Sequence, residues 1–376
     1  MMLREELLKA WWKLANLPGV GRVTLNEIRQ QLSHPNDLLQ CSVEQLVALG
    51  LKPQAAQRWK TDNTLLQGFD VVQNWCRFKG YGVLLAGVAP YPPALAALRD
   101  APTILYYHGN PACLNNPMVA MVGSRNPTDY GARWAQQTAQ ELAEAGVTVV
   151  SGLAIGIDGF VHQGAIAAGS TIAVMGSGPD VIYPQRHLGL AQMVTQQGLL
   201  LSEFAPGTAA QSRQFPSRNR IISGLSLATV VVEAAIKSGS LITAHQAAEQ
   251  GREVFALPGL VNNPVSQGCH QLIRDGAYLV QSADDILTEL GLRGAPPGVQ
   301  DSLDFGAPAE VNKQPTSALK VQPLPPLVTH IDFSATSADL IAIRSGLAME
   351  QLLPGLMELE LAGWITQLPG GYQRLK

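Results

Sequence analysis

The chain has 376 residues, a length that exceeds one ordinary domain and predicts two or three. Its hydrophobic residues, 46% of the total, are enough for packed cores. A formal net charge of −3 excludes a globally basic protein, so any nucleic-acid surface must be a local patch. The four cysteines have neither zinc-ligand nor redox-motif spacing, and no signal peptide or membrane-spanning run is evident. These features predict a cytoplasmic protein with reduced thiols and no membrane contact.

Residues 1–65 carry apolar side chains at helical spacing and predict a small helical domain. Between two of its helices lies the stretch LPGVGR, residues 17–22. Two glycines around one small apolar residue are typical of a helix-hairpin-helix or SAM-like domain, in which backbone amides can face a phosphate. The alternative, that these glycines only make turns, stays open because the local charge is not strongly basic.

Residues 66–293 alternate between apolar strand-like runs and helical patterns. This alternation indicates βαβ units and a mostly parallel sheet of the α/β class. The runs are continuously apolar, as expected when helices cover both faces of the sheet. They are residues 82–86, 118–122, 147–151, 171–175, 199–203, 227–233 and 253–257.

Residues 294–322 are rich in proline and glycine and predict a linker. Residues 323–376 then show two helical segments and a glycine-tipped hairpin, which is the order of a winged helix. The second helix would be the one that reads a DNA groove, but it carries Glu350, Glu358 and Glu360. We therefore expect this domain to contact protein, or DNA only weakly.

Glycine-rich and hydroxyl-rich loops follow four of the predicted strands. Because the carboxyl ends of parallel strands meet at one edge of a sheet, these loops should lie together. Their amides near helix starts predict one long groove for oxyanions. The loops are residues 123–125, 152–158, 175–187 and 237–241.

A basic stretch with an aromatic residue, QSRQFPSRNRIIS, occupies residues 211–223. Arginine matches phosphate with a planar fork, and Phe215 can stack on an unpaired base. Such a loop suits a single strand of nucleic acid better than a small cofactor. In the alternative interpretation, Arg218 and Arg220 pair with internal carboxylates and order the loop.

Several enzyme motifs are missing. The sequence has no GxGxxG after the first strand of the sheet and no Walker-type GxxxxGK[ST], which argues against a dehydrogenase and an ATP site.

Asp158 and His162 could form an acid/base or metal pair, but without a third ligand or a nucleophile we interpret them as structural. Glu233, near Lys237 at a strand end, is either an ion-pair anchor or part of a nucleotide site.

Six stretches in the central region resemble the DNA-processing protein family called DprA or Smf. The resemblance is dense from about residue 70 to residue 290, and the flanking modules resemble the longer family members. The stretches are MVGSR (121–125), SGLAIGID (151–158), MGSGPDVIYP (175–184), FPSRNRIISGL (215–225), KSGSLITA (237–244) and GREVFALPG (251–259).

The resemblance implies an extended Rossmann-like domain that binds single-stranded DNA without a cofactor or catalysis. It further implies that the protein protects incoming DNA and loads the RecA recombinase in natural transformation. A homodimer would form through the same domain, near Cys269, His270, Leu272 and Ile273 in residues 268–280. The implied DNA contacts are Gly123, Ser124, Arg125, Arg186, Phe215, Arg218, Asn219, Arg220, Lys237, Ser238, Gly239 and Ser240, with Gln185 standing where the family has a basic residue.

One alternative is a nucleotide-processing enzyme on a related fold, such as a nucleoside-monophosphate phosphoribohydrolase. Enzymes of that group carry a glycine-rich PGGxGT loop followed by a glutamate. Here the matching place reads KSGSL, residues 237–241, and Glu233 precedes it. This departure makes hydrolysis the less favoured reading.

Overall fold

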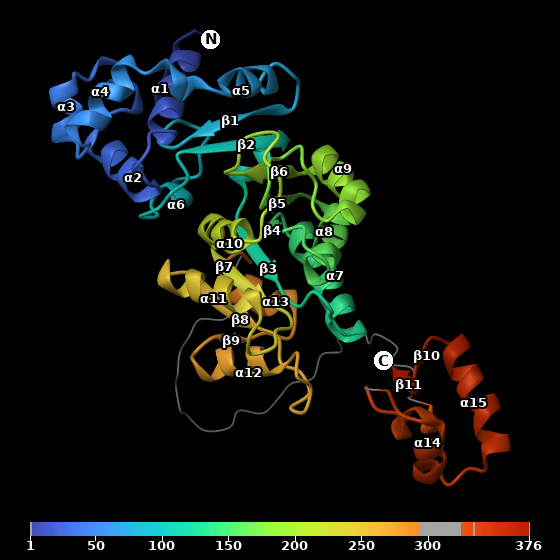
Figure 1. The fold of residues 1–376 in the computed structure, drawn as a ribbon. Helices are drawn as coiled ribbons and strands as arrows, with labels where there is room; N and C mark the ends of the chain where they lie inside the picture. The colour runs from blue at the N-terminus through green and yellow to red at the C-terminus, as the bar shows by residue number, and fades with distance from the viewer. Residues whose placement is uncertain (1, 294–324, 334, 376) are drawn as a thin grey trace, which may run out of the picture. The chain divides into compact units, whose positions relative to one another are not determined.

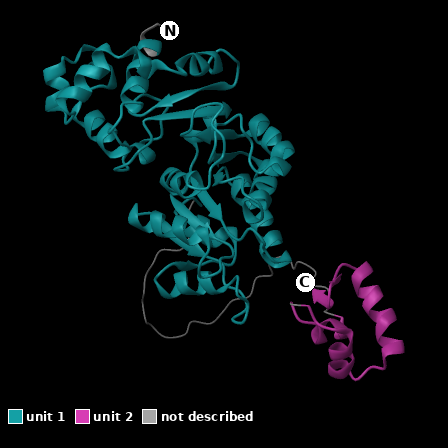
Figure 2. Ribbon diagram, in the orientation of Figure 1, with its two compact units in different colours: residues 1–299 teal, residues 300–376 magenta. Residues whose placement is uncertain are grey.

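The computed structural model describes residues 2–293, 325–333 and 335–375. The chain forms two compact units, residues 1–299 and residues 300–376 (Figure 2). Within the described ranges, no helix is both long enough and apolar enough to cross a membrane. The predicted linker, residues 294–322, lies outside the described residues.

The first unit begins with the predicted helical region. The stretch 17–22 joins its first two helices, as predicted, and Gly19 adopts a positive φ of 81° that favours glycine in this turn. The helices are α1 (Met2–Ala15), α2 (Arg22–Gln31), α3 (Val43–Ala48) and α4 (Pro53–Thr61), with 3₁₀ turns η1 (Pro35–Gln40) and η2 (Asn63–Leu66). A second short turn, residues 49–52, joins α3 and α4. A further helix, α5 (Phe69–Trp75), follows beyond residue 65, where the helical region was predicted to end.

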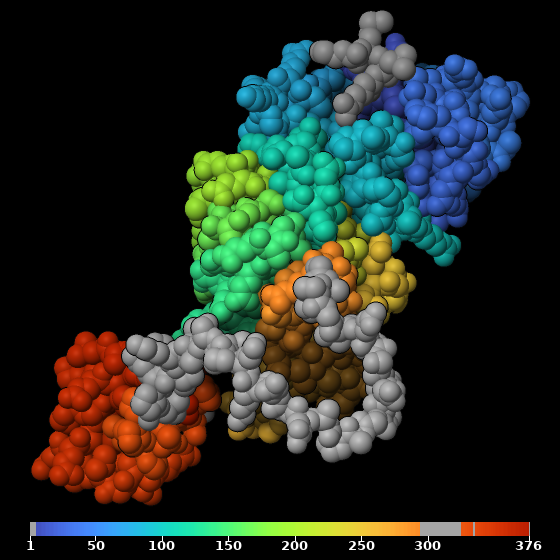
Figure 3. All heavy atoms as spheres, turned by 180° about the vertical axis from the view of Figure 1, so that it is seen from behind, coloured from blue at the N-terminus to red at the C-terminus, as the bar shows by residue number. Residues whose placement is uncertain are grey.

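The core of these helices continues into the sheet. Trp11, Leu14 and Ile28 are fully buried and belong to the same apolar cluster as Ile104 and Tyr106. Figure 3 shows from behind that the blue N-terminal helices abut the teal region of the first two strands. The helical region therefore packs directly on the α/β region within one compact unit.

A nine-stranded sheet forms the centre of this unit, with strand order β1-β2-β6-β5-β4-β3-β7-β8-β9. Strands β3 to β9 pair in parallel, whereas β1–β2 and β2–β6 pair antiparallel. All seven predicted runs are strands; β2 and β9 were not predicted. The strands are β1 (Tyr81–Leu85), β2 (Ile104–Gly109), β3 (Met118–Val122), β4 (Thr148–Ser151), β5 (Thr171–Met175), β6 (Leu199–Ser202), β7 (Ala228–Val231), β8 (Glu253–Ala256) and β9 (Tyr278–Leu279).

Helices cover both faces of the sheet, which explains the continuous apolar runs. Along β3, Val119 and Met121 pack in the layer of α7, α8 and α13, while Ala120 and Val122 pack in the layer of α10, α11 and α12. Figure 1 shows the helices on the two sides of the sheet. The helices are α6 (Pro93–Ala96), α7 (Asp129–Glu144), α8 (Ile157–Ala168), α9 (Leu188–Gln197), α10 (Gln214–Leu225), α11 (Gly239–Glu249), α12 (Gln267–Arg274) and α13 (Ala283–Glu289), with 3₁₀ turns η3 (Pro111–Asn115) and η4 (Gln185–His187).

The strand order places a topological switch point at β3. From this strand the chain winds to one side through β4, β5 and β6, and later to the other side through β7 and β8. In open α/β sheets, ligands bind in the crevice at the carboxyl ends of the strands that flank such a point. The fold therefore predicts a ligand site at the loops after β3 and β7.

The second unit has the predicted winged-helix order. Its core includes Ile341, Leu352, Leu356 and Ile365, all almost fully buried. Gly346 ends the first helix in the left-handed conformation, with φ of 70°. The elements are η5 (Pro326–His330), α14 (Ala338–Ser345), α15 (Met349–Leu361) and a hairpin of β10 (Ile365–Leu368) and β11 (Gly371–Arg374).

Candidate functional site

A groove of about 800 Å³ lies at the switch point, between the loops that follow β3 and β7 and the start of α10. Of the twelve residues predicted to contact DNA, ten line it and two, Arg186 and Arg220, do not. The ten are Gly123, Ser124, Arg125, Phe215, Arg218, Asn219, Lys237, Ser238, Gly239 and Ser240. Segments more than a hundred residues apart in sequence therefore form one wall.

The loop after β3 is held from both sides. The Ser124 carbonyl accepts a hydrogen bond of 3.0 Å from the Ile157 amide at the start of α8. The Gly123 carbonyl accepts one of 2.7 Å from the Ser240 hydroxyl on α11. With its backbone fixed in this way, the loop presents the exposed Arg125 side chain to the groove.

The start of α11 forms the opposite part of the wall. Ser238 is the N-cap, and its hydroxyl accepts from the Ser240 amide at 3.2 Å. The first amides of a helix lack intrahelical acceptors and carry the positive end of the helix dipole. With the exposed Lys237 immediately before it, this helix start is suited to a phosphate.

Two aromatic rings lie beside these cationic groups. The ring centroids of Tyr183 and Phe215 are 5.4 Å apart, and Tyr183 is 54% exposed. A Cβ at Gly176 would overlap the Phe215 ring, so glycine at this turn leaves room for it. Tyr183 was not among the predicted residues, although an aromatic side chain in a loop after a strand was the available signal. Together the rings offer a surface on which a base can stack.

Arg218 lines the floor of the groove but is only 5% exposed. Its Nη1 donates to the Gly152 carbonyl at 2.7 Å and also to the Val174 carbonyl. Burial lowers the pKa of Arg218 to about 10, with the Asp158 carboxylate opposing this shift. Arg218 therefore stays charged at neutral pH and ties the loop after β4 to the end of strand β5. It orders the loops as the alternative interpretation expected, but these hydrogen bonds go to backbone carbonyls and not to the internal carboxylate of that interpretation.

Asp158 and His162 are internal groups. Asp158 accepts from the Gly152 and Ala154 amides at 3.1 and 3.2 Å. His162 Nε2 accepts from the Leu153 amide at 3.3 Å, and burial lowers the pKa of His162 to about 3. Among the described residues, no group of three or more His, Cys, Asp or Glu side chains could hold a metal. These contacts agree with the structural interpretation of the pair.

Glu233 is 3% exposed and binds the entry to α7. Its carboxylate accepts from the Thr128 amide at 2.8 Å and from the Thr128 hydroxyl at 2.5 Å. Burial raises the pKa of Glu233, and the hydrogen bonds from Thr128 oppose this rise. Because Thr128 is the N-cap of α7, Glu233 fixes the start of that helix.

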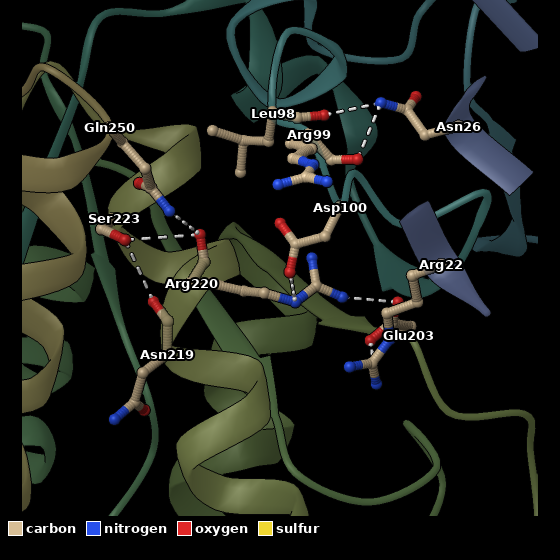
Figure 4. Close-up of polar contacts among 10 residues, drawn as sticks. All are labelled: Arg22, Asn26, Leu98, Arg99, Asp100, Glu203, Asn219, Arg220, Ser223 and Gln250. Atoms are coloured by element: carbon tan, nitrogen blue, oxygen red, sulfur yellow. Dashed lines mark hydrogen bonds and ion pairs between the residues drawn. The ribbon is translucent and has the colours of Figure 1, made fainter. Parts of the chain in front are cut away.

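The structure does not bring Arg220 and Arg186 into the groove. Arg220 is 5% exposed; its Nη2 lies 2.6 Å from Glu203 and its Nε 3.2 Å from Asp100 (Figure 4). Here the alternative interpretation, pairing with internal carboxylates, describes the geometry. Arg186 is exposed in η4, outside the groove lining.

The segment expected to form a dimer also needs correction in detail. Cys269 is fully buried and Leu272 is 6% exposed, and both belong to the core of the sheet. His270 hydrogen-bonds the backbone of Gly259 at 3.0 Å. The apolar side of α12 is therefore used within the chain, and Cys269 and Leu272 are not available to a partner.

Comparison with known proteins agrees with this architecture. The chain matches the family described as DNA recombination-mediator protein A over residues 83–291 and the DprA winged helix domain over residues 311–371. It is 44% identical over 306 residues to protein Smf of Escherichia coli (strain K12), covering 80% of this chain and 79% of the relative. It is 37% identical over 291 residues to the DNA processing protein DprA of Bacillus subtilis (strain 168), covering 77% and 91%.

Two solved structures share the fold. DprA from Streptococcus pneumoniae aligns with a TM-score of 0.64 at 35% identity, covering 76% of this chain and 95% of that one. DNA processing protein A from Helicobacter pylori aligns with a TM-score of 0.52 at 32% identity, covering 56% and 95%, and is described as having a unique single-stranded DNA binding mode. The chain belongs to the DNA recombination-mediator protein A (DprA) family.

Proposed function

We propose that this chain is a non-enzymatic single-stranded DNA-binding protein and that the groove at the switch point is its DNA site. The observation that carries the proposal is the convergence of Arg125, Lys237 and the start of α11 on one groove. All three are suited to phosphate, and they lie beside the rings of Tyr183 and Phe215. The related protein from Helicobacter pylori, which binds single-stranded DNA, supports the same substrate class.

The chemistry of the groove favours a flexible strand over a duplex. Cations and helix amides recognise phosphates whatever the base, and aromatic rings stack on any base once it is unpaired. Bases inside a duplex are already stacked and cannot use the Tyr183–Phe215 surface. We therefore expect tight binding to single strands, weaker binding to duplexes and little sequence preference.

The bound strand would then be protected and passed to the recombinase RecA during natural transformation, by a homodimer of this chain. The family description as a recombination mediator supports this role. We further propose four regions: a helical domain of residues 1–65, the DNA-binding domain of residues 66–293, a linker of residues 294–322 and a winged helix from residue 323.

Charge reversal at the groove tests the DNA site. Arg125→Glu and Lys237→Glu should each weaken binding to labelled oligo-dT about tenfold or more, because each places a negative charge where a phosphate sits. The slope of log affinity against log salt should also fall by about 0.7 for each lost phosphate contact. Fluorescence anisotropy at several salt concentrations measures both quantities.

Lys79→Glu is the matched control, since Lys79 is an exposed cation in the turn between α5 and β1, outside the groove lining. It should bind oligo-dT nearly as tightly as the parent protein. If both groove variants bind as tightly as the parent while the control does too, the groove is not the DNA site.

A further inference from the structure

Four charged side chains form a chain of ion pairs between α2 and α10, which we call the α2–α10 ion cluster (Figure 4). Arg22 Nη2 lies 2.9 Å from Glu203 Oε2, and Glu203 Oε1 lies 2.6 Å from Arg220 Nη2. Arg220 Nε lies 3.2 Å from Asp100 Oδ2. The cluster thus joins the start of α2, the loop after α6, the end of β6 and the middle of α10.

The cluster contains two positive and two negative side chains, and the two central ones are largely buried. The Arg220 and Glu203 side chains are 6% and 12% exposed, whereas Arg22 and Asp100 at the two ends are each 41% exposed. A guanidinium in such a place is held by its carboxylates, because leaving either charge buried and unpaired is strongly unfavourable. Arg220 is therefore committed to Glu203 and Asp100.

The same helix carries the groove residues on its other side. Arg220 follows Arg218 by two residues, a rotation of about 200° around a helix, so the two side chains point in roughly opposite directions. Phe215 and Asn219 of α10 line the groove. The carbonyl of Arg220 also accepts from Gln250 Nε2 at 3.1 Å, beyond the end of α11. The cluster therefore anchors α10 from behind the groove.

The other end of the cluster belongs to the helical region. Arg22 is the first residue of α2 and the last residue of the hairpin stretch 17–22. Further along α2, Asn26 Nδ2 donates to the Leu98 and Arg99 carbonyls at 2.8 and 3.1 Å (Figure 4). The helix is thus fixed to the loop that carries Asp100, and the joint between the two regions is polar and specific.

We propose that Arg220 is a positioning residue for DNA binding: through the α2–α10 ion cluster it holds α10, and with it Phe215 and Asn219, in place against the N-terminal helical region. This inference rests on the proposed function, since it assigns a role in the same groove. It separates Arg220 from Arg125 and Lys237, which would touch phosphate directly. It also gives the N-terminal helices a part in DNA binding that requires no contact with DNA.

Glu203→Gln distinguishes positioning from direct contact because the two roles predict opposite changes in the affinity for oligo-dT. If Arg220 acts through Glu203, loss of this carboxylate loosens α10, and affinity for oligo-dT should fall about fivefold with an unchanged salt slope. If Arg220 is itself a phosphate ligand, release from Glu203 should strengthen binding and steepen the salt slope. Strengthened or unchanged affinity in folded Glu203→Gln protein would overturn the inference.

Hydrogen exchange separates a local effect on α10 from general destabilisation. In the free Glu203→Gln variant, exchange should become faster in residues 214–225 and stay unchanged in α7, and oligo-dT should restore slow exchange in α10. Arg220→Lys, which keeps the charge, should bind more tightly than Arg220→Met. Uniformly faster exchange throughout the first unit would mean a purely structural role.

Asp284→Asn is the control, because it makes the same charge change in the exposed ion pair between Asp284 of α13 and Arg293. It should leave affinity unchanged. If Glu203→Gln does not fold, Arg22→Gln tests the exposed end of the cluster, with a smaller loss in the same direction and again no change in slope. Failure of the parent protein to bind oligo-dT would refute the proposed function instead.

Discussion

At the scale of single residues, burial divides basic side chains that look equivalent in the sequence. Arg125 and Lys237 are exposed on the groove, whereas Arg218 and Arg220 are each 5% exposed and bonded internally. A buried guanidinium needs fixed partners, so it orders the loops around it and is less available to a mobile ligand. The buried Glu233 carboxylate likewise has fixed partners, because it accepts hydrogen bonds from the amide and the hydroxyl of Thr128. This internal role weakens the case for Glu233 as a group in nucleotide hydrolysis.

His162 makes stability depend on pH. The pKa of His162 is lowered from 6.5 to about 3, mainly by burial, so the folded chain binds fewer protons than the unfolded chain between these values. The contribution of His162 to the free energy of unfolding is therefore fully present above about pH 6.5 and is lost progressively as the pH drops toward 3. From about pH 7.5 to about pH 5, this one group should remove about 2 kcal/mol from the free energy of unfolding. Urea unfolding at both pH values measures it.

His162→Gln is the matching comparison, because glutamine cannot titrate. The variant should lose about 2 kcal/mol less than the parent over the same interval, whatever its stability at the higher pH. Equal losses in the two proteins would show that His162 does not contribute to the pH dependence.

At the scale of elements, the groove is made from the places where strands end and helices begin. The start of α11 is the clearest case, with Ser238 as N-cap and Gly239 as first helical residue. Sequence spacing could predict this start, because hydroxyl and glycine residues between a buried strand and a helical pattern are typical of it. It could not show that the Gly123 carbonyl would accept from Ser240, since that contact joins residues far apart in the chain.

Gly239→Pro tests whether the first amide of α11 binds phosphate. Proline is well tolerated as the first residue of a helix, and Ser238, with φ of −72° and ψ of 142°, already has the conformation required before proline. The variant should fold normally but bind oligo-dT roughly tenfold more weakly, because one donor to a charged acceptor is lost. Anisotropy and thermal unfolding measure the two effects.

Gly239→Ala keeps the amide and is the control. A Cβ at this position meets no atom within 4 Å, so alanine should neither strain the helix nor block the groove. If proline and alanine variants bind oligo-dT equally well, this amide does not contact the strand.

At the scale of the whole molecule, the winged helix forms a separate compact unit with its own core. The exposed side of α15 carries Glu350, Glu358 and Glu360 together with Leu353 and Met357. Acidic side chains repel phosphate, so this helix is poorly suited to DNA. The first unit contains the whole groove.

Removal of residues 323–376 should therefore change affinity for oligo-dT by less than about twofold, since no phosphate contact is lost. Anisotropy on the truncated and full-length chains gives the comparison, with circular dichroism as a check of folding. A large loss of affinity in a folded truncated protein would place an essential part of the DNA site in the winged helix.

Local rules predicted the class of fold, seven of the strands and the glycine loops of the groove. These rules are apolar periodicity, glycine turns and the shared edge of parallel strands. Phe215, Arg218 and Asn219 were predicted instead from a basic stretch with an aromatic residue and from the family resemblance. The local rules missed β2 and β9; β9 spans only Tyr278–Leu279, too short for a pattern to register. The pairing of Arg220 with Glu203 and the burial of Cys269 could not be predicted in this way, because burial depends on which distant segments pack together in the folded chain.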